Sequence, residues 1–245
     1  MRLAEAGYAP GTINLTLAAM RGLLGHCRKL RLLSPDDFED VRDVRRVRCR
    51  GTVAGRALEK EEIVLLFRAV EALPHPLRER DLALLAIGFS SGARRVEIAA
   101  LDLDDYQADR PAVRIRSGKG GRDRLAFLTR AAAVHVDAWV EVRGSDAGPL
   151  LYSVTSHGWI QPRRLAATTV YERFRRLSLA AGIGHLSPHD ARRTVATSML
   201  AAGVDIVTTA RQTGHASLDV LRTSYDRRGE ESVRQAVANS IGIPA

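Results

Sequence analysis

The chain has 245 residues, 45% apolar and 27% charged, a balance typical of a globular protein and unlike that of a disordered chain. Its net charge of +9 predicts a polyanionic partner, with nucleic acid favoured over a ribosomal surface or anionic lipid. Two cysteines without a CxxC motif, the absence of a signal-peptide pattern and short apolar runs predict a soluble, cytoplasmic protein with no membrane association.

The N-terminal part reads as two short helices followed by a basic linker. Apolar residues recur at helical spacing over 13–30, with Thr12 as the candidate cap, and Ser34 followed by Pro35 favours a second helix start. Residues 44–55 are rich in arginine and punctuated by glycine. We interpret them as an interdomain linker that also contacts a polyanion, the alternative being a solvated charged loop. The arginines assigned to this contact are Arg45, Arg46, Arg48 and Arg50.

The middle of the chain predicts a larger helical domain that carries a β-hairpin. Helices are expected over about 59–72, 77–91, 94–101 and 130–142, with the apolar second half of 77–91 at the buried centre. Apolar and polar residues alternate over 112–116 and 122–127 across a glycine-rich turn, which predicts a hairpin with Lys119 at its tip. No Ser or Thr follows Lys119 and a strand comes next, so a Walker A phosphate loop is excluded. A lysine that reaches into a groove and an ordinary surface turn both fit this tip.

The C-terminal part adds one strand and several helices. The strand is expected over 150–152 and a helix over 168–181. Ser187 followed by Pro188 starts a helix that ends near residue 203, and a shorter helix ends at Gly214. A last helix with one apolar face is expected over 230–241. The fold class predicted is therefore mainly α with one small antiparallel β-sheet (α+β).

A set of polar side chains in this part is suited to phosphate chemistry. His189 and Arg192 lie three residues apart and project from one face of the first helical turn. His215 follows Gly214 directly, and Tyr225 comes ten residues after His215. Arginine grips phosphate oxygens bidentately, histidine moves protons near neutral pH, and tyrosine can attack phosphorus. Simpler readings are a helix-surface pair for His189 and Arg192 and a helix-end contact for His215.

Arg94 is the remaining cation that the pattern singles out. It lies at a helix N-terminus, where a guanidinium is unfavourable against the helix dipole unless an anion also binds there. The alternative is an exposed arginine bonded to Glu97. The histidines show no HExxH signature, so neither a metal nor a cofactor is predicted.

Five motifs in order resemble those of the tyrosine recombinase (phage integrase) family. SSGARRVEIAAL is similar to its first arginine box, SGKGGRDR to its hairpin lysine, and SPHDARRT with TGHASL to its second box. Tyr225, in TSYDRR, falls where the family has its nucleophile. Order and rough spacing agree over about residues 58–228. The resemblance implies that fold for residues 56–245, with helix 230–241 at the end, preceded by a partial helical core-binding segment and basic linker over 1–55.

The resemblance also implies a role for each matching residue. Arg94 and Arg192 would bind the phosphate, Lys119 would be the general acid, His189 and His215 the histidine pair, and Tyr225 the nucleophile. Arg122 and Arg193, beside these residues, are added as candidate DNA contacts. Three departures from the family pattern are visible, one being that the helix beginning at Glu59 lacks the usual Ser or Thr cap. Tyr225 is one residue further from His215 than in many members, and only about 55 residues precede the catalytic part.

The activity implied is site-specific recombination of double-stranded DNA through a 3′-phosphotyrosyl intermediate, without metal or ATP. Homo-oligomers on DNA, from dimer to tetramer, are implied as well, and the C-terminal helix 230–241 is expected to dock on its own domain or on a neighbour's. Three alternatives stay open: a type IB topoisomerase, a DNA-binding protein that keeps the fold without catalysis, and a metal-dependent nuclease.

Overall fold

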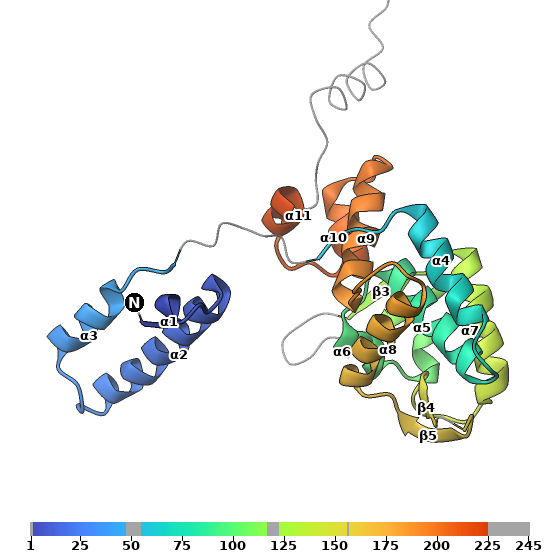
Figure 1. Cartoon of the computed structure of the whole chain (residues 1–245), viewed down its shortest axis with the longest axis horizontal. Helices are drawn as coiled ribbons and strands as arrows, with labels where there is room; N and C mark the ends of the chain where they lie inside the picture. The colour runs from blue at the N-terminus through green and yellow to red at the C-terminus, as the bar shows by residue number, and fades with distance from the viewer. Residues whose placement is uncertain (1, 48–54, 117–122, 156, 225–245) are drawn as a thin grey trace, which may run out of the picture. The chain divides into compact units, whose positions relative to one another are not determined.

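The computed structural model describes residues 2–47, 55–116, 123–155 and 157–224, which fall into two compact units, Met1–Ala54 and Gly55–Ala245 (Figure 1). Each unit is described by itself. Helix 230–241, expected from the sequence, lies outside the described residues, and the roles expected for the two parts of the chain remain predictions.

The N-terminal unit contains the helices α1 (Arg2–Glu5), α2 (Pro10–Lys29) and α3 (Pro35–Asp43). The cap expected at Thr12 is wrong, because α2 already begins at Pro10, whose fixed φ suits the first helical position. The start of α3 is confirmed, since the Ser34 hydroxyl accepts from the Asp37 N–H at 3.1 Å. In the described part of this unit Ile13 alone is buried. The unit therefore has almost no core of its own.

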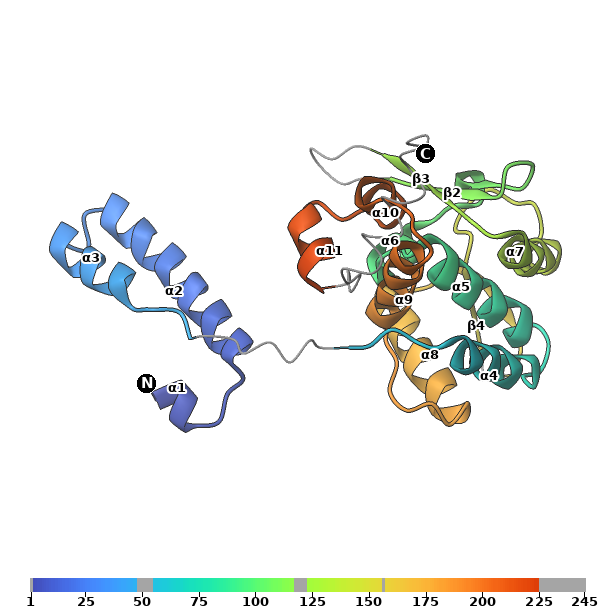
Figure 2. The same ribbon diagram turned by 90° about the horizontal axis from the view of Figure 1, so that it is seen from above.

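The larger unit, Gly55–Ala245, is built mainly from helices. Its helices are α4 (Lys60–Glu71), α5 (Leu77–Ser91), α6 (Arg95–Ala100), α7 (Arg130–Arg143), α8 (Ala167–Ala180), α9 (Pro188–Ala201), α10 (Ile206–Thr213) and α11 (Leu218–Ser224), with a short 3₁₀ turn η1 (Leu103–Asp105). Residues 82–88 of α5 are all buried, and α5 packs against α4, α7 and α9 (Figure 2). The prediction that this helix forms the buried centre is confirmed.

Two small antiparallel sheets complete the unit, where the sequence predicted one. β2 (Ala112–Ile115) and β3 (Arg124–Phe127) form the predicted hairpin, with Val113 opposite Ala126, and β1 (Tyr106–Gln107) extends it on the β2 side. The second sheet pairs β4 (Tyr152–Val154) with β5 (Ile160–Arg164). β5 was missed because it contains Pro162 and shows no apolar alternation.

A main hydrophobic core joins most of these helices and both sheets, and a smaller cluster lies between α9, α10 and α11. Trp139 of α7 and Phe174 of α8 are among its largest fully buried side chains. The Trp139 indole N–H donates to the Leu150 carbonyl at 2.8 Å, which explains why Leu150 is core rather than strand and why the predicted strand began two residues early. Gly88 of α5 is needed here, since a Cβ would lie 2.8 Å from Cζ of Phe174. In the described ranges no helix is long and apolar enough to cross a membrane.

Candidate active site

A left-handed turn at the end of α5 sets the position of Arg94. Gly92 has φ +62°, which favours glycine, and a Cβ there would lie 3.0 Å from the Thr213 side chain. The chain then reverses, and Arg94 becomes the N-cap of α6. Its side chain is half-exposed, so the guanidinium can meet a ligand from solvent. The alternative interpretation, an exposed arginine bonded to Glu97, is confirmed by the ion pair at 2.7 Å, and anion binding by Arg94 stays a prediction.

The first turn of α9 presents His189 and is fixed by a carboxylate. Asp190 Oδ2 accepts from the Ser187 N–H at 2.8 Å and from the Ser187 hydroxyl at 2.7 Å. Its other oxygen accepts from the Arg56 N–H at 2.8 Å. Gly55 has φ +90°, and a Cβ there would lie 2.1 Å from Asp190 Oδ1. Asp190 therefore joins the start of α9 to the first residues of this unit.

Arg192, one turn further along α9, is buried and is bonded to two turns. It is 2% exposed, and its Nη1 donates to the Gly92 carbonyl at 2.9 Å and to the Thr213 carbonyl. The guanidinium therefore links the turn that carries Arg94 to the turn that carries His215. A buried arginine held at two carbonyls is pre-organised, which is what binding of a planar oxyanion requires.

His215 follows the end of α10, where Gly214 has φ +73°. The Thr213 hydroxyl donates to the Thr209 carbonyl at 2.7 Å and contacts His215 Nδ1 at 2.7 Å. Because its proton is used on the carbonyl, the hydroxyl accepts from Nδ1–H, which assigns the neutral tautomer with an unprotonated Nε2. Burial, with the nearby charges of Arg192 and Arg94, lowers the pKa of His215 to about 3.

The pKa of His189 is lowered by similar surroundings. Loss of surrounding water, followed by the charges of Arg192 and Arg193, lowers the pKa of His189. Both histidines are therefore neutral at pH 7 in this structure and able to accept a proton. The positive charge of the site comes from its arginines.

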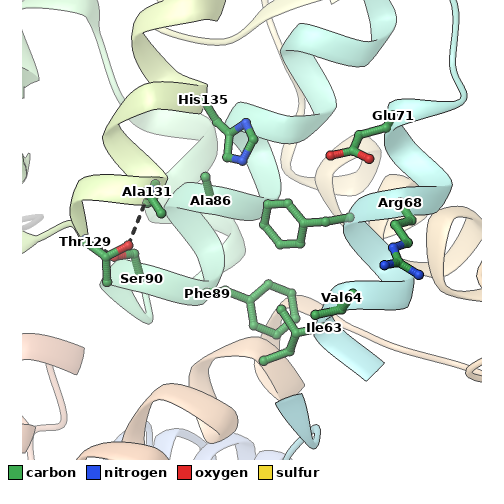
Figure 3. Close-up of a pocket in the computed structure, with 12 residues that line it drawn as sticks. Ile63, Val64, Arg68, Glu71, Ala86, Phe89, Ser90, Thr129, Ala131 and His135 are labelled. Atoms are coloured by element: carbon green, nitrogen blue, oxygen red, sulfur yellow. Dashed lines mark hydrogen bonds between the residues drawn. The ribbon is translucent and has the colours of Figure 1, made fainter. Parts of the chain in front are cut away.

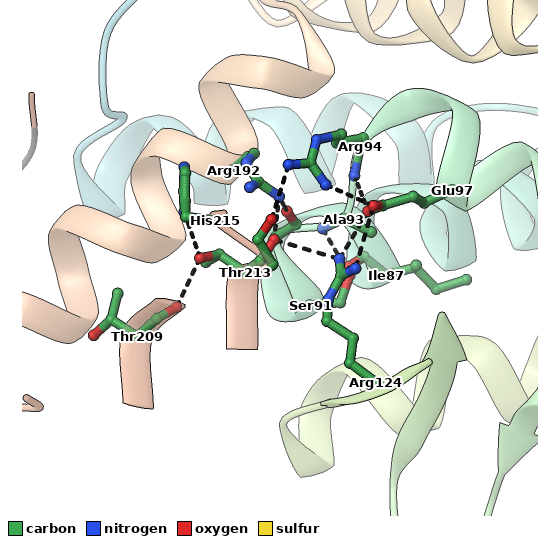
Figure 4. A network of polar contacts seen from close by, with 12 residues as sticks. Ile87, Ser91, Ala93, Arg94, Glu97, Arg124, Arg192, Thr209, Thr213 and His215 are labelled. Atoms are coloured by element: carbon green, nitrogen blue, oxygen red, sulfur yellow. Dashed lines mark hydrogen bonds and ion pairs between the residues drawn. The ribbon is translucent and has the colours of Figure 1, made fainter. Parts of the chain in front are cut away.

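Three predicted residues of the two boxes, Arg94, His189 and Arg192, meet at one small pocket of about 250 Å³. Its lining residues are Arg94, Arg95, Tyr171, Ser187, Pro188, His189 and Arg192. Figure 4 shows Arg94 and Arg192 converging with His215 around Thr213. Two arginines and two histidines brought together from segments about 120 residues apart can bind a phosphate group and exchange protons with its substituents.

Several predicted site residues cannot be placed. Lys119, Arg122 and Tyr225 lie outside the described residues, as do Arg48 and Arg50 of the linker. Arg45 and Arg46 are exposed. Arg193 is 7% exposed, which leaves little of its side chain for a phosphate, so its contact with DNA stays a prediction.

Sequence reasoning missed three residues of the site. Arg124 and Thr213 belong to the polar network of Figure 4, and Tyr171 lines the pocket with its hydroxyl 3.0 Å from His185 Nε2. Arg124 carries a readable signal, because it is an arginine on the alternating strand that follows the predicted lysine tip. Tyr171 carries none, since a tyrosine in an amphipathic helix is ordinary.

A second pocket, of about 450 Å³, lies between α4, α5 and α7 and is mostly apolar (Figure 3). Phe67 and His135 meet across it with ring centroids 5.5 Å apart. The charged side chains at this pocket, Arg68 and Glu71, have opposite signs, so the pocket lacks the concentrated positive charge of the first. Across the described ranges, no group of three or more His, Cys, Asp or Glu residues is placed to hold a metal ion.

The mainly helical fold with small antiparallel sheets, and a pocket lined by Arg94, His189 and Arg192 with His215 close by, are those of an integrase-type protein. The model of the phage integrase family matches residues 56–231, which is most of the chain. The chain belongs to this family.

Individual relatives and solved structures agree with the family. Tyrosine recombinase XerA of Thermococcus kodakarensis is 29% identical over 181 residues, which cover 74% of this chain and 61% of that protein. Tyrosine recombinase XerC of Chlamydia caviae is 29% identical over 230 residues, covering 89% of this chain and 68% of that one. The Tn1549 transposon integrase, solved in complex with transposon right end DNA, shares the fold with a TM-score of 0.71 at 15% identity, covering 97% of this chain and 82% of that chain.

Proposed function

We propose that this chain is a site-specific recombinase that cleaves and rejoins DNA strands through a 3′-phosphotyrosyl intermediate, without metal or ATP. The observation that carries the proposal is the pocket in which Arg94, Arg192 and His189 converge, with His215 beside them. Membership of the phage integrase family and the names of the XerA and XerC relatives support the same activity.

In the proposed reaction, the Tyr225 phenol oxygen attacks the scissile phosphorus and the bond to the 5′-oxygen breaks. Free tyrosine has a pKa of about 10, so the attack needs a base at neutral pH. The neutral ring of His189 would take the phenol proton, and Lys119 would give a proton to the departing 5′-oxygen. Arg94 and Arg192 would neutralise the charge that develops on the non-bridging oxygens. The phosphotyrosyl bond conserves the energy needed for rejoining.

His215 would act at a non-bridging oxygen. With Nδ1–H bonded to Thr213, its Nε2 can donate to a phosphate oxygen only after the ring has gained a proton. A bound phosphodiester brings a negative charge, which raises the pKa of the ring and favours that proton. DNA binding would therefore be coupled to proton uptake at His215.

The partners of the proposed reaction are double-stranded DNA and further copies of the chain. The solved integrase with the same fold is in complex with transposon right end DNA, and the net charge of +9 suits such a ligand. The chain spans 61% of the length of the XerA relative, so the assembly of a dimer or tetramer on DNA belongs to the proposal. A cytoplasmic location belongs to the same proposal.

The test is covalent trapping on a nicked suicide substrate. Wild-type protein is expected to form a protein–DNA adduct in the presence of EDTA, and Tyr225→Phe is expected to abolish it while DNA binding persists. Tyr171→Phe is the matched control, because Tyr171 also lines the arginine pocket. An adduct that survives Tyr225→Phe and disappears in Tyr171→Phe would assign the nucleophile to α8 instead.

A DNA-binding protein that has kept the fold without catalysis is the second candidate. It is favoured by the His215 to Tyr225 spacing of ten residues, one more than in many members. Specific DNA binding with no adduct from any protein in the trapping experiment would select it. Relaxation of plasmid without resolution of Holliday junctions would select a type IB topoisomerase.

A further inference from the structure

Arg124 on β3 reaches from the hairpin into the candidate active site. Its guanidinium meets both oxygens of Glu97, with Nη1–Oε1 at 3.2 Å and Nη2–Oε2 at 2.7 Å. Nη2 also donates to the Thr213 carbonyl at 3.3 Å. The Arg124 side chain is only 20% exposed and that of Glu97 14%, so the pair is shielded from solvent. Five donors in a rigid fork allow one arginine to make all these contacts.

Glu97 is shared between two arginines. The same carboxylate accepts from Arg94 Nη1 at 2.7 Å and from the Arg94 N–H at 2.8 Å. Two guanidiniums and one carboxylate leave this group with a net charge of +1. Without Arg124, Glu97 would neutralise Arg94 alone, and the group would offer a phosphate no net charge. Arg124 therefore decides how much of the charge of Arg94 is available to a ligand.

Arg124 also lies against the turn that carries His215. Gly214 packs so closely on it that a Cβ at Gly214 would lie 2.4 Å from the Arg124 Cζ. Arg94 Nη2 donates to the Gly214 carbonyl at 2.8 Å from the same network (Figure 4). Gln212, just before this turn, is also bonded to β3. Its Oε1 accepts from the Phe127 N–H at 3.1 Å, and its Nε2 donates to the Phe127 carbonyl at 2.8 Å. β3 and the turn 213–215 thus form one hydrogen-bonded unit.

We propose that Arg124 is a positioning residue for strand cleavage, an inference that rests on the recombinase function proposed above. Arg124 offsets the negative charge of Glu97, so that the positive charge of Arg94 remains available to the scissile phosphate. It also fixes the turn that presents His215. The β2–β3 hairpin and the turn 213–215 are thereby bonded to each other through one side chain.

The kinetic test compares Arg124→Gln with Arg114→Gln. Arg114 is a matched control, because it lies on β2 of the same sheet and pairs with the buried carboxylate of Asp105 at 3.2 Å. At saturating protein, Arg124→Gln is expected to slow adduct formation on nicked DNA about 10- to 100-fold, the effect of a misplaced catalytic group, while Arg114→Gln stays near wild type. Arg124→Lys keeps the positive charge but lacks the planar guanidinium, so its rate of adduct formation is expected to lie between those of Arg124→Gln and wild type.

A substrate with a methylphosphonate at the cleavage position separates positioning from general damage. This linkage carries no negative charge for Arg94 to meet, so the defect of Arg124→Gln is expected to shrink on it. An equal slowing on both linkages, with a lowered melting temperature, would overturn the proposal in favour of simple destabilisation.

Titration with inorganic phosphate, followed through the histidine NMR signals, needs no recombination site. Arg124→Gln is expected to weaken phosphate binding several-fold and to raise the pKa of His215, and Arg114→Gln to do neither. Equal phosphate affinity and an equal His215 pKa in wild type and Arg124→Gln would show that Arg124 is not a positioning residue. Weakened phosphate binding in Arg124→Gln, combined with no adduct from wild type, would instead remove only the recombinase function.

Discussion

Acidification is expected to destabilise the Gly55–Ala245 unit through His215. The fold keeps this ring neutral, with a pKa of about 3 against about 6.5 in an unfolded chain, so the unfolded state takes up the proton first. Stability is therefore fully present above about pH 6.5 and is lost as the pH falls toward 3. His189, whose pKa is also lowered, adds to the loss in the same direction.

The size of the effect follows from linkage. Between pH 7 and pH 5, a histidine with these two pKa values contributes a loss of about 2 kcal/mol in the free energy of unfolding. The ring is half-buried and solvent screens its neighbours, so we expect about 1 kcal/mol from His215. For a unit of this size, that is a fall of roughly 2–4 °C in melting temperature.

Tryptophan fluorescence is a suitable assay, because Trp139 and Trp159 both lie in this unit and report on it alone. His215→Gln removes the titrating group and is expected to flatten the dependence of the unfolding free energy on pH. His26→Gln, a histidine replacement in the N-terminal unit, is the control and should leave the dependence unchanged. A His215→Gln protein with the wild-type slope between pH 7 and pH 5 would refute the reasoning.

Three further predictions concern the proposed reaction. Arg94→Ala or Arg192→Ala should each slow adduct formation by roughly 10²-fold or more, and Lys at either position should rescue poorly; full activity of both Lys variants would leave these residues as structural ion pairs. The second prediction concerns the linker arginines Arg45, Arg46, Arg48 and Arg50. Neutralising them together should reduce the slope of log DNA affinity against log salt concentration by up to about one unit per lost phosphate contact. An unchanged slope would make the linker a solvated loop. Truncation after Gly229 should weaken assembly on DNA and alter cleavage, measured by crosslinking with and without DNA, and identical behaviour of both lengths would leave helix 230–241 a lid on its own domain.

Helix positions in the larger unit could be predicted because their signals are local. The apolar half of α5 and the glycine at its end required no knowledge of neighbouring segments. β1 and β5 could not be predicted in this way. β1 has two residues and β5 contains a proline, so each exists as a strand only because a partner segment lies beside it.

The residues of the candidate site also divide into those with a local sequence signal and those without one. Arg94, His189, Arg192 and His215 were named from motifs, and the structure brings them together, although their roles stay predictions. The network around Glu97 was not foreseen, since Arg124 contacts Glu97 across 27 residues of chain and the Thr213 carbonyl across 89. Side-chain contacts at such separations depend on the packed fold.

The attachment of residue 55 to α9 has a mechanical consequence. The Asp190 carboxylate holds the Arg56 N–H, and two residues later the Leu58 N–H donates to the Thr194 hydroxyl at 2.9 Å, which itself donates to the Asp190 carbonyl at 2.8 Å. A displacement of the backbone at Arg56 would therefore be transmitted directly to the helix turn that presents His189, because both Arg56 and Leu58 are bonded to the first two turns of α9.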